Sequence, residues 1–407
     1  EDYVEHGSLG SRSMYACPNI ETRDLIVRLD RPQPTFMRAP HEGPGMPALE
    51  IALDELAHSL GLDPLAIRLT NYAEHDPTSG KPFSSKELRQ CYRVGAGLFG
   101  WDRRPPVPGT SRDGDELVGF GMASALMSTF RFAAQARVTL ARDGGVVVET
   151  AAHEIGTGVL TILPQIAAEV LGVSPNRVRV AIADTDLPEA GGTFGSATTL
   201  SVGSAVEAAA HKLKATLESM AAEPGLEPHE YSELLALRRL DQVSETASWA
   251  PRREENAFAM NSYGAVFAEV RVDPLLPVPR VSRLVGVYSC GRIINPTTAR
   301  SQLIGGLTWG LGQALLEKSP VDRRDGRFLP RGFGGYHLPC NADVGTIEAH
   351  FVEEFDPHAS ALGARGAGEI GTIGVGAAIA NAVFNATGVR VRDLPIRIEH
   401  LLTPPVR

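Results

Sequence analysis

The sequence predicts an α+β fold in which helices pack on mixed sheets. Of the 407 residues, 43% are hydrophobic and 21% are charged, an ordinary globular composition, and the length favours two or three packed units. Segments with the alternating pattern of strands recur along the chain, followed by glycine-rich loops and then by helices. No repeat of short period accompanies this recurrence, so a solenoid is not expected.

The first expected elements are loops and two helices. Residues 1–45 are rich in turn formers and should form loops with one short strand at 24–29. Leucines at helical spacing predict an amphipathic helix over residues 48–60, with Gly61 at its C-cap. An Asp-Pro pair then begins a short helix over residues 63–69.

Prolines and glycines cluster at residues 103–114, which is the best candidate for a linker. We therefore expect one unit at 1–102, a linker at 103–115 and a second unit at 116–407.

The second unit should alternate strands and helices. Asp143-Gly144-Gly145 lies between two alternating segments, which is a strong hairpin signal. Alternation of apolar and polar residues predicts strands at 135–140, 146–150, 177–182, 265–272, 281–288 and 394–399. Helical spacing predicts helices at 159–171, 202–220, 297–316 and 377–386, the last with Gly388 as its C-cap.

Charge and cysteine content exclude several functions. The net charge is −9 and the pI is about 5.7, whereas nucleic acids and anionic membranes require a basic face, so neither is an expected partner. No apolar run has the length of a membrane helix. Four widely spaced cysteines without a C-x-x-C pair argue against a zinc or iron–sulfur site in this chain. They favour a reducing compartment such as the cytoplasm, and a periplasmic location stays open.

Four loops of small residues precede predicted helices, at residues 154–158, 192–199, 291–298 and 365–371. A helix N-terminus offers unpaired N–H groups and a positive dipole end, and glycines let the backbone approach a ligand closely. Such loops can hold a pyrophosphate. The alternative is that each loop is only an N-cap and a turn.

The last of these loops contains the G-x-G-x-x-G pattern at residues 366–371. We reject a dinucleotide fingerprint, because no strand pattern precedes it and Glu369 within it would repel a phosphate. If the helix behind the loop is buried, Glu369 lies among apolar groups and can serve as a base. An exposed loop glutamate is the alternative.

Signatures of hydrolases are missing from the sequence. His153-Glu154 and His41-Glu42 lack the second histidine of the zinc motif H-E-x-x-H, and no G-x-S-x-G elbow occurs.

Five short motifs occur in a fixed order along the chain. They are Phe36-Met37-Arg38-Ala39-Pro40, the helix 50–60 with Asp63-Pro64 and residues 68–71, Ile155-Gly156-Thr157-Gly158, Tyr336-x-Leu338-Pro339, and the run from Gly363 to Glu369. In this order they resemble the molybdenum-binding subunit of the xanthine dehydrogenase and aldehyde oxidase family, especially its bacterial aldehyde oxidoreductase branch. The likeness covers nearly the whole chain, as the end of a first and all of a second molybdopterin-binding subdomain.

The resemblance implies a molybdopterin cytosine dinucleotide whose molybdenum is held by the pterin dithiolene and not by protein side chains. It implies that Glu369 is the general base and that Arg38 approaches the metal from the side. The residues that it places around the cofactor are Arg38, Ile155, Gly156, Thr157, Gly158, Ser196, Ala197, Thr198, Thr199, Arg292, Ile293, Ile294, Asn295, Pro296, Thr297, Thr298, Gln302, Arg365, Gly366, Ala367 and Gly368.

The implied activity is a hydroxylase that oxidises aldehydes to carboxylic acids, or hydroxylates N-heterocycles such as purines, with water as the oxygen source. Electrons would leave through partner subunits that carry a [2Fe–2S] cluster and FAD. Two departures from the family stand out. Thr157 occupies a position where many members have a glutamine, and the family's large subunit begins well before Glu1. We therefore expect a missing upstream portion as a further partner, and a cofactor-free fragment that keeps only the fold and the subunit interface is the alternative.

Overall fold

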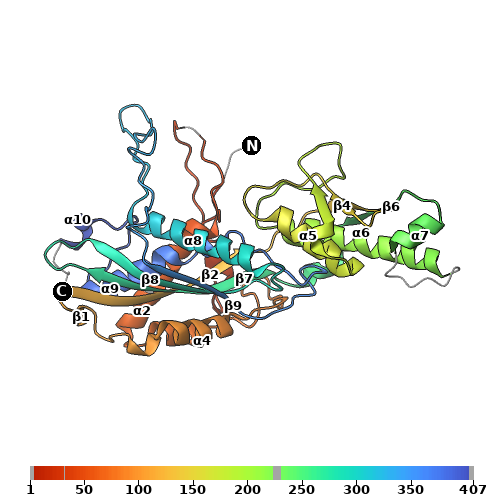
Figure 1. The fold of residues 1–407 in the computed structure, drawn as a ribbon. Helices are drawn as coiled ribbons and strands as arrows, with labels where there is room; N and C mark the ends of the chain where they lie inside the picture. Colours follow the sequence, from red (N-terminus) through yellow and green to blue (C-terminus); the bar gives the residue numbers. More distant parts are fainter. Residues whose placement is uncertain (1–3, 32, 223–230, 403–407) are drawn as a thin grey trace.

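The computed structural model describes residues 4–31, 33–222 and 231–402, and two sheets organise them (Figure 1). The larger sheet has the strand order β1-β2-β7-β8-β9. Its strands are β1 (Arg112–Asp113), β2 (Glu116–Ser128), β7 (Asn261–Val272), β8 (Pro279–Ser289) and β9 (Thr346–Phe351). All neighbours are antiparallel except β8 and β9, which are parallel. The last residue of β2, Ser128, pairs with the first residue of β7, Asn261.

Helices cover both faces of this sheet. The helices and short 3-10 turns of this unit are α1 (Leu9–Ser13), α2 (Glu42–Ser59), α3 (Pro64–Thr70), α4 (Leu88–Phe99), η1 (Trp101–Arg103), η3 (Arg253–Ala257), α8 (Pro296–Leu315), η4 (Ile370–Thr372), α9 (Val375–Thr387) and α10 (Ile398–Leu401). On β2, Gly119 and Gly121 face α9, and a Cβ on either would overlap the α9 backbone. Phe120, between them, meets Phe99 of α4 edge-to-face, so α4 packs on the opposite face.

The smaller sheet has the order β5-β4-β3-β6. Its strands are β3 (Ala134–Ala141), β4 (Val146–Glu149), β5 (Val178–Ala181) and β6 (Gln242–Trp249). Helices α5 (Val159–Leu171), α6 (Thr198–Ala221) and α7 (Tyr231–Leu237), with the turn η2 (Pro175–Arg177), complete this unit on the right of Figure 1. Whereas β3 pairs with β4 and β6 in antiparallel fashion, β4 and β5 are parallel.

Each sheet has its own buried cluster. The cluster of the larger sheet joins residues from both sides of the expected linker, for example Met46 of α2 and Leu284 of β8. The cluster of the smaller sheet holds residues such as Val148 and Leu213. The division of the chain at 103–115 stays a prediction about subdomains. The two buried clusters do not follow this division, because residues 134–249 supply most of the cluster of the smaller sheet.

Most predicted elements of the second unit are confirmed. The predicted helix at 159–171 matches α5 in its bounds, and the hairpin at residues 143–145 joins β3 and β4. The predicted helices at 48–60, 63–69, 202–220, 297–316 and 377–386 correspond to α2, α3, α6, α8 and α9.

Two predicted strands are wrong. Residues 24–29 are not a strand but exposed extended chain, with Leu25 76% exposed. Residues 394–399 do not pair with a strand either, because the Ile396 N–H donates instead to Ala314 O at the end of α8. The helices and strands that were not predicted from the sequence are α1, α4, α7, α10, β1, β2, β6 and β9.

One stretch, Ile370–Thr387, is long and apolar enough to cross a membrane by length and composition. In the folded chain 94% of it is buried, because α9 packs between the larger sheet and α2. It is therefore a core helix.

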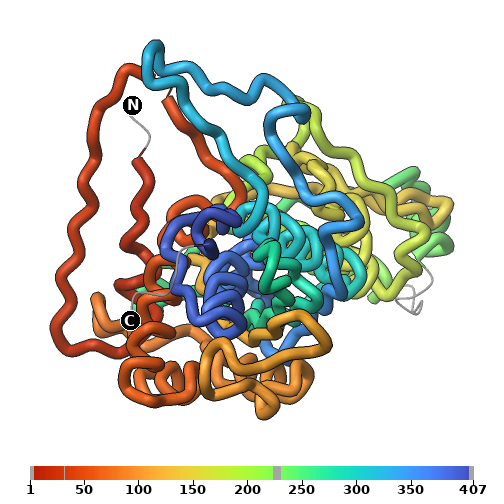
Figure 2. The backbone as a smooth tube through the Cα atoms, turned by 90° about the vertical axis from the view of Figure 1, so that its left-hand side faces the viewer, coloured from red at the N-terminus to blue at the C-terminus, as the bar shows by residue number. Residues whose placement is uncertain are grey.

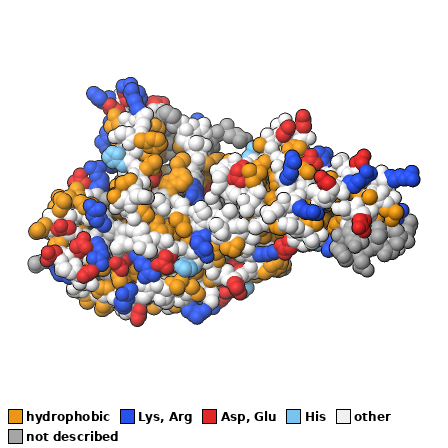
Figure 3. Space-filling view, viewed as in Figure 1, with side chains coloured by type: hydrophobic (Ala, Val, Ile, Leu, Met, Phe, Trp, Pro, Cys, Tyr) orange, Lys and Arg blue, Asp and Glu red, His pale blue; other side chains and the backbone are white. Residues whose placement is uncertain are grey.

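Two long arms project from the body (Figures 1 and 2); the described residues 16–31 and 33–37 belong to the first, and residues 317–345 form the second. Their tips meet, since a Cβ on Gly326 would lie 2.9 Å from Asp30 O. Exposed apolar side chains such as Phe333 lie along the arms, and Arg and Lys atoms gather at the tips (Figure 3). The base of the first arm runs into the cavity described next.

Candidate active site

A cavity of about 490 Å³ lies between the two sheet units, and all four small-residue loops reach it. The predicted residues that line it are Arg38, Ile155, Thr157, Ser196, Thr198, Thr199, Arg292, Ile293, Ile294, Asn295, Thr298, Gln302, Arg365, Ala367, Gly368 and Glu369. The other predicted residues belong to the same loops but do not line the cavity: Gly156, Gly158, Ala197, Pro296, Thr297 and Gly366.

Several lining residues were not identified from the sequence. Phe36 and Met37 precede Arg38 in a motif of the resemblance, and Phe194 lies in one of the small-residue loops, so a signal existed for these three. Trp309 lines the cavity from the fourth turn of α8, where only the tertiary structure could have placed it.

Glu369 is half-buried and lines this cavity. The backbone N–H of Ala39 donates to its Oε1 at 3.2 Å, and the Ser196 hydroxyl donates to its Oε2 at 2.9 Å. Both donors have left-handed backbones, with φ of 61° at Ala39 and 56° at Ser196. Such conformations are unfavourable for residues other than glycine and are characteristic of functional sites. The carboxylate is therefore held in place from two segments that are far apart in the sequence.

Arg38 connects the base of the first arm to the loop before Glu369 and to helix α8. Its Nε donates to Gly368 O at 2.9 Å, and its Nη2 donates to Gln302 O at 2.8 Å. Burial lowers the pKa of Arg38, and the negative charge of Glu369 opposes this shift. The side chain thus fixes residue 368 directly beside the glutamate.

The glycines before Glu369 make room for Ser196. A Cβ on Gly366 would lie 2.8 Å from Ser196 Cβ, and one on Gly368 would lie 3.4 Å from Ser196 Oγ. The small residues of this loop therefore allow Ser196 to reach the glutamate.

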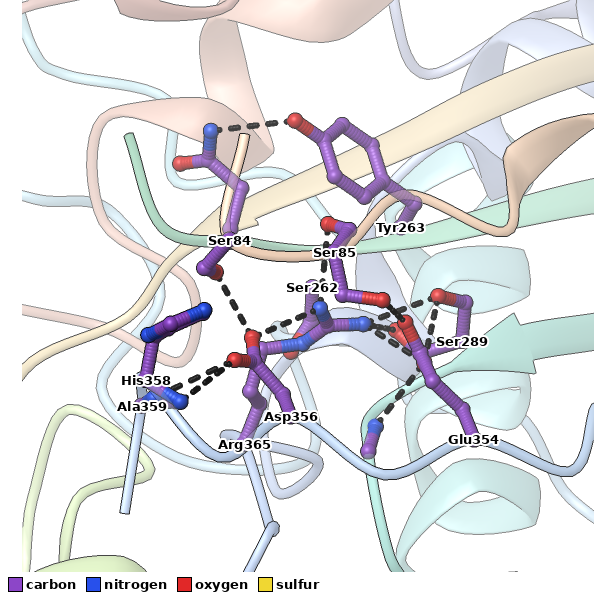
Figure 4. A network of polar contacts seen from close by, with 12 residues as sticks. Ser84, Ser85, Ser262, Tyr263, Ser289, Glu354, Asp356, His358, Ala359 and Arg365 are labelled. Atoms are coloured by element: carbon purple, nitrogen blue, oxygen red, sulfur yellow. Dashed lines mark hydrogen bonds and ion pairs between the residues drawn. The ribbon is translucent and has the colours of Figure 1, made fainter. Parts of the chain in front are cut away.

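The Arg365 side chain lies in a buried network of polar contacts (Figure 4). Its fully buried guanidinium contacts Glu354 at 2.6 Å and Asp356 at 3.1 Å, and it also donates to Ser289 Oγ and to Ser85 O. The guanidinium is thus occupied by protein partners, and the expectation that Arg365 lines the cofactor stays a prediction. The ion-pair network instead fixes the start of the loop that carries Glu369.

In the loop at 154–158, the loop's own glutamate accepts hydrogen bonds from the backbone N–H groups. Glu154 Oε1 accepts from the N–H groups of Gly156 at 2.7 Å and Gly158 at 3.1 Å, and its Oε2 accepts from Leu160 N–H at 3.1 Å. Partial burial disfavours the charged carboxylate, but these backbone donors prevail and lower the pKa of Glu154. Thr157 Oγ1 is buried at the cavity wall and has no hydrogen-bond partner.

The helix N-termini at the cavity differ in their capping. At α8, Asn295 Oδ1 accepts from Thr298 N–H at 2.9 Å. At α6 no side-chain cap is present, and Thr198 and Thr199 of its first turn line the cavity. An anion is thus best received at the α6 terminus, where N–H groups and a positive dipole end are left for it.

Polar pairs close the rim of the cavity. Arg292 Nη2 donates to both carboxylate oxygens of Glu169 on α5 at 2.7 Å, and Gln302 Nε2 donates to Gly156 O at 3.0 Å. Over residues 4–31, 33–222 and 231–402, no group of three or more His, Cys, Asp and Glu side chains is arranged to hold a metal ion.

Comparison with known proteins identifies the family. A model of a molybdopterin cofactor-binding domain matches residues 95–345, and a second model of the same description matches residues 3–72. The chain belongs to the molybdenum-binding subunits of the xanthine dehydrogenase and aldehyde oxidase family. The resemblance and the fold class predicted from the sequence are thus confirmed.

Relatives within this family share about half of their length with the chain. The aldehyde oxidoreductase molybdenum-binding subunit PaoC of Escherichia coli K12 is 40% identical over 96% of the chain and 55% of PaoC. The putative xanthine dehydrogenase molybdenum-binding subunit XdhA of the same strain is 32% identical over 87% of the chain and 51% of XdhA. The aldehyde oxidoreductase structure from Desulfovibrio desulfuricans ATCC 27774 superposes with a TM-score of 0.74 at 26% identity, covering 89% of the chain and 40% of that protein.

Proposed function

We propose that this chain forms the part of a molybdenum hydroxylase subunit that carries the general base, and that the enzyme oxidises aldehydes to carboxylic acids. The reaction converts an aldehyde and water into a carboxylic acid, two protons and two electrons. The electrons leave through partner subunits that carry a [2Fe–2S] cluster and FAD. Within the family, PaoC shares more identity with the chain than XdhA does, which favours an aldehyde over a purine as the substrate.

The observation that carries this proposal is the placement of Glu369. It lies on the cavity wall, between the arm base and the loop at 196, with both carboxylate oxygens held by hydrogen bonds. A carboxylate fixed in this way and open to a cavity can take a proton from a bound reactant. Ser196 and Ala39 orient it, and Arg38 fixes the loop that precedes it.

The cavity residues fit a molybdopterin cofactor. The uncapped N-terminus of α6 can receive a phosphate, and the unpartnered hydroxyl of Thr157 can bond a polar edge of the pterin. Since side chains from the described ranges offer no metal cluster, the pterin would supply the ligands of the metal. We propose the cytosine dinucleotide form. When bound, this group supplies the metal centre that accepts the two electrons of the substrate.

The test uses the chain assembled with the rest of its large subunit and its electron-transfer subunits. We expect molybdenum and acid-released CMP in equal amounts, turnover of benzaldehyde with an artificial acceptor, and 18O from labelled water in the benzoate. Glu369→Gln should retain molybdenum while turnover falls by several orders of magnitude, and Glu189→Gln, an exposed glutamate outside the cavity, should leave both unchanged.

Three results would contradict parts of this proposal. An assembled protein without molybdenum and CMP would indicate a cofactor-free member of the family. Turnover of hypoxanthine but not of benzaldehyde would assign the enzyme to N-heterocycles. Substantial activity of Glu369→Gln would exclude Glu369 as the base.

A further inference from the structure

We propose that Glu154 is a positioning residue whose carboxylate acts as a built-in anion at the N-terminus of α5, so that this loop presents the Thr157 hydroxyl to the cavity and excludes a phosphate. Of the four loops that the sequence marked as anion sites, this one already contains its anion.

The geometry shows how the loop is filled. Glu154 accepts three backbone hydrogen bonds, from residues 156, 158 and 160, at 2.7 to 3.1 Å. These are the N–H groups that would otherwise point to a bound phosphate. Gly156 and Gly158 have φ of 96° and 89°, which lets the chain wrap around the carboxylate. No ion pair of Glu154 occurs among the described residues, and the backbone N–H groups of this loop stabilise its charge.

The charge of Glu154 reverses the electrostatics of the loop. A free helix N-terminus carries about half a positive charge, whereas a terminus with a bound carboxylate carries a net negative one. An incoming phosphate would meet like charge at α5, while the α6 terminus has no side-chain cap and keeps its first N–H groups open to an anion. The two termini line one cavity, so the difference between them sets the orientation of an anionic ligand.

A second observation indicates what the loop does instead. Thr157 Oγ1 is buried at the cavity wall without a partner, and a buried hydroxyl without a hydrogen bond is costly. Thr157 lies between Gly156 and Gly158, two of the three residues whose N–H groups Glu154 accepts from. The carboxylate therefore fixes the backbone on either side of the unpartnered Thr157 hydroxyl.

The inference rests on the proposed function only for the identity of the excluded group, and its test does not use enzymatic activity. We would measure the binding of inorganic phosphate and pyrophosphate to the full chain without cofactor by titration calorimetry. Wild type, Glu154→Ala, Glu154→Gln and the matched control Glu189→Ala are compared. Glu189 belongs to the same unit and is exposed, and its removal changes the net charge equally.

We expect Glu154→Ala to bind phosphate at least tenfold more tightly than wild type, because three N–H groups lose their anion. Acetate should compete with this binding and raise the melting temperature of the variant, but not that of wild type. Glu154→Gln should show a smaller gain, since the amide oxygen keeps hydrogen bonds but loses the charge. Glu189→Ala should bind phosphate as wild type does.

Two results would overturn the proposal. If Glu154→Ala and Glu154→Gln fold cooperatively and neither gains phosphate affinity, Glu154 is only a helix cap. If wild type binds phosphate and both variants lose it, the loop is a phosphate site that needs Glu154. If Glu154→Ala does not fold, Glu154→Gln decides alone by the same criterion.

Discussion

Removing the Arg365 guanidinium should destabilise the whole chain and not merely empty the cavity. In Arg365→Met, the carboxylates of Glu354 and Asp356 lose their cation while they stay buried, at 3% and 0% side-chain exposure. Ser289 Oγ and Ser85 O also lose a donor. Breaking a buried ion pair on one side costs about 3–5 kcal/mol, so we expect a loss of this size in the free energy of unfolding.

The measurement is urea unfolding of the full chain, followed by circular dichroism. Adding Glu354→Gln to Arg365→Met should restore part of the lost free energy of unfolding, because the double variant no longer buries the Glu354 carboxylate without its cation. A loss below about 1 kcal/mol in Arg365→Met, accompanied by a loss of bound cofactor in the assembled enzyme, would refute this reasoning. Arg365 would then act on the ligand directly and not through the fold.

Three further changes have outcomes that the structure specifies. Gly366→Ala should displace Ser196, whose Cβ would lie 2.8 Å from the new methyl, and should lower cofactor content as measured by molybdenum analysis. Gly97→Ala, with open space around the new methyl, is the matched control and should have the cofactor content of wild type. In the assembled enzyme, Ser196→Ala should reduce kcat more than it raises KM for the aldehyde, because it removes a bond that orients Glu369; an unchanged kcat would contradict that role. Burial lowers the pKa of Lys86 to about 7, so the folded state binds fewer protons than the unfolded state between pH 7 and 10. The free energy of unfolding of wild type should therefore rise over this range relative to that of Lys86→Met, by at most about 1.4 kcal/mol per pH unit. If the urea midpoints of the two proteins change with pH in the same way, the lowered pKa of Lys86 is excluded.

Local chemistry explains which elements could be predicted from the sequence. Helix α5 begins after Gly158 and ends before Gly172, and both glycines have a left-handed backbone. Its bounds could therefore be predicted from the sequence. Strand β2 was missed although it is long. Its residues that face α9, Gly119, Gly121 and Ala123, are small because the α9 backbone approaches so closely, and small residues weaken the alternation that indicates a strand.

Helix α4 shows the opposite case. Leu88, Cys91, Tyr92 and Phe99 lie on its buried side at helical spacing, so the signal was present and was overlooked.

The candidate site was predicted as separate loops, and the structure adds their arrangement. The base Glu369 and the loops around it could be marked from motifs, but the contact of Ala39 with Glu369 joins residues 330 positions apart. Likewise, the buried partners of Arg365 are distant in the sequence, from Ser85 near the beginning to Ser289 of β8 and Glu354. No local pattern therefore indicates that its side chain turns inward. The role of Glu154 also depends on geometry, because its sequence resembles an incomplete zinc motif and not a cap.

The pairing of Ser128 with Asn261 makes β2 and β7 a hairpin whose connection, residues 129–260, contains the smaller sheet. The entropic cost of closing a connection grows only slowly with its length, so an inserted unit that folds by itself is well tolerated. The cavity draws two of its loops from the insert and the rest from the host. It therefore comes into existence only when both units have folded. A host whose insert is replaced by a two-residue turn would keep the Ala39 contact of Glu369 but lose the Ser196 hydroxyl that holds its other carboxylate oxygen.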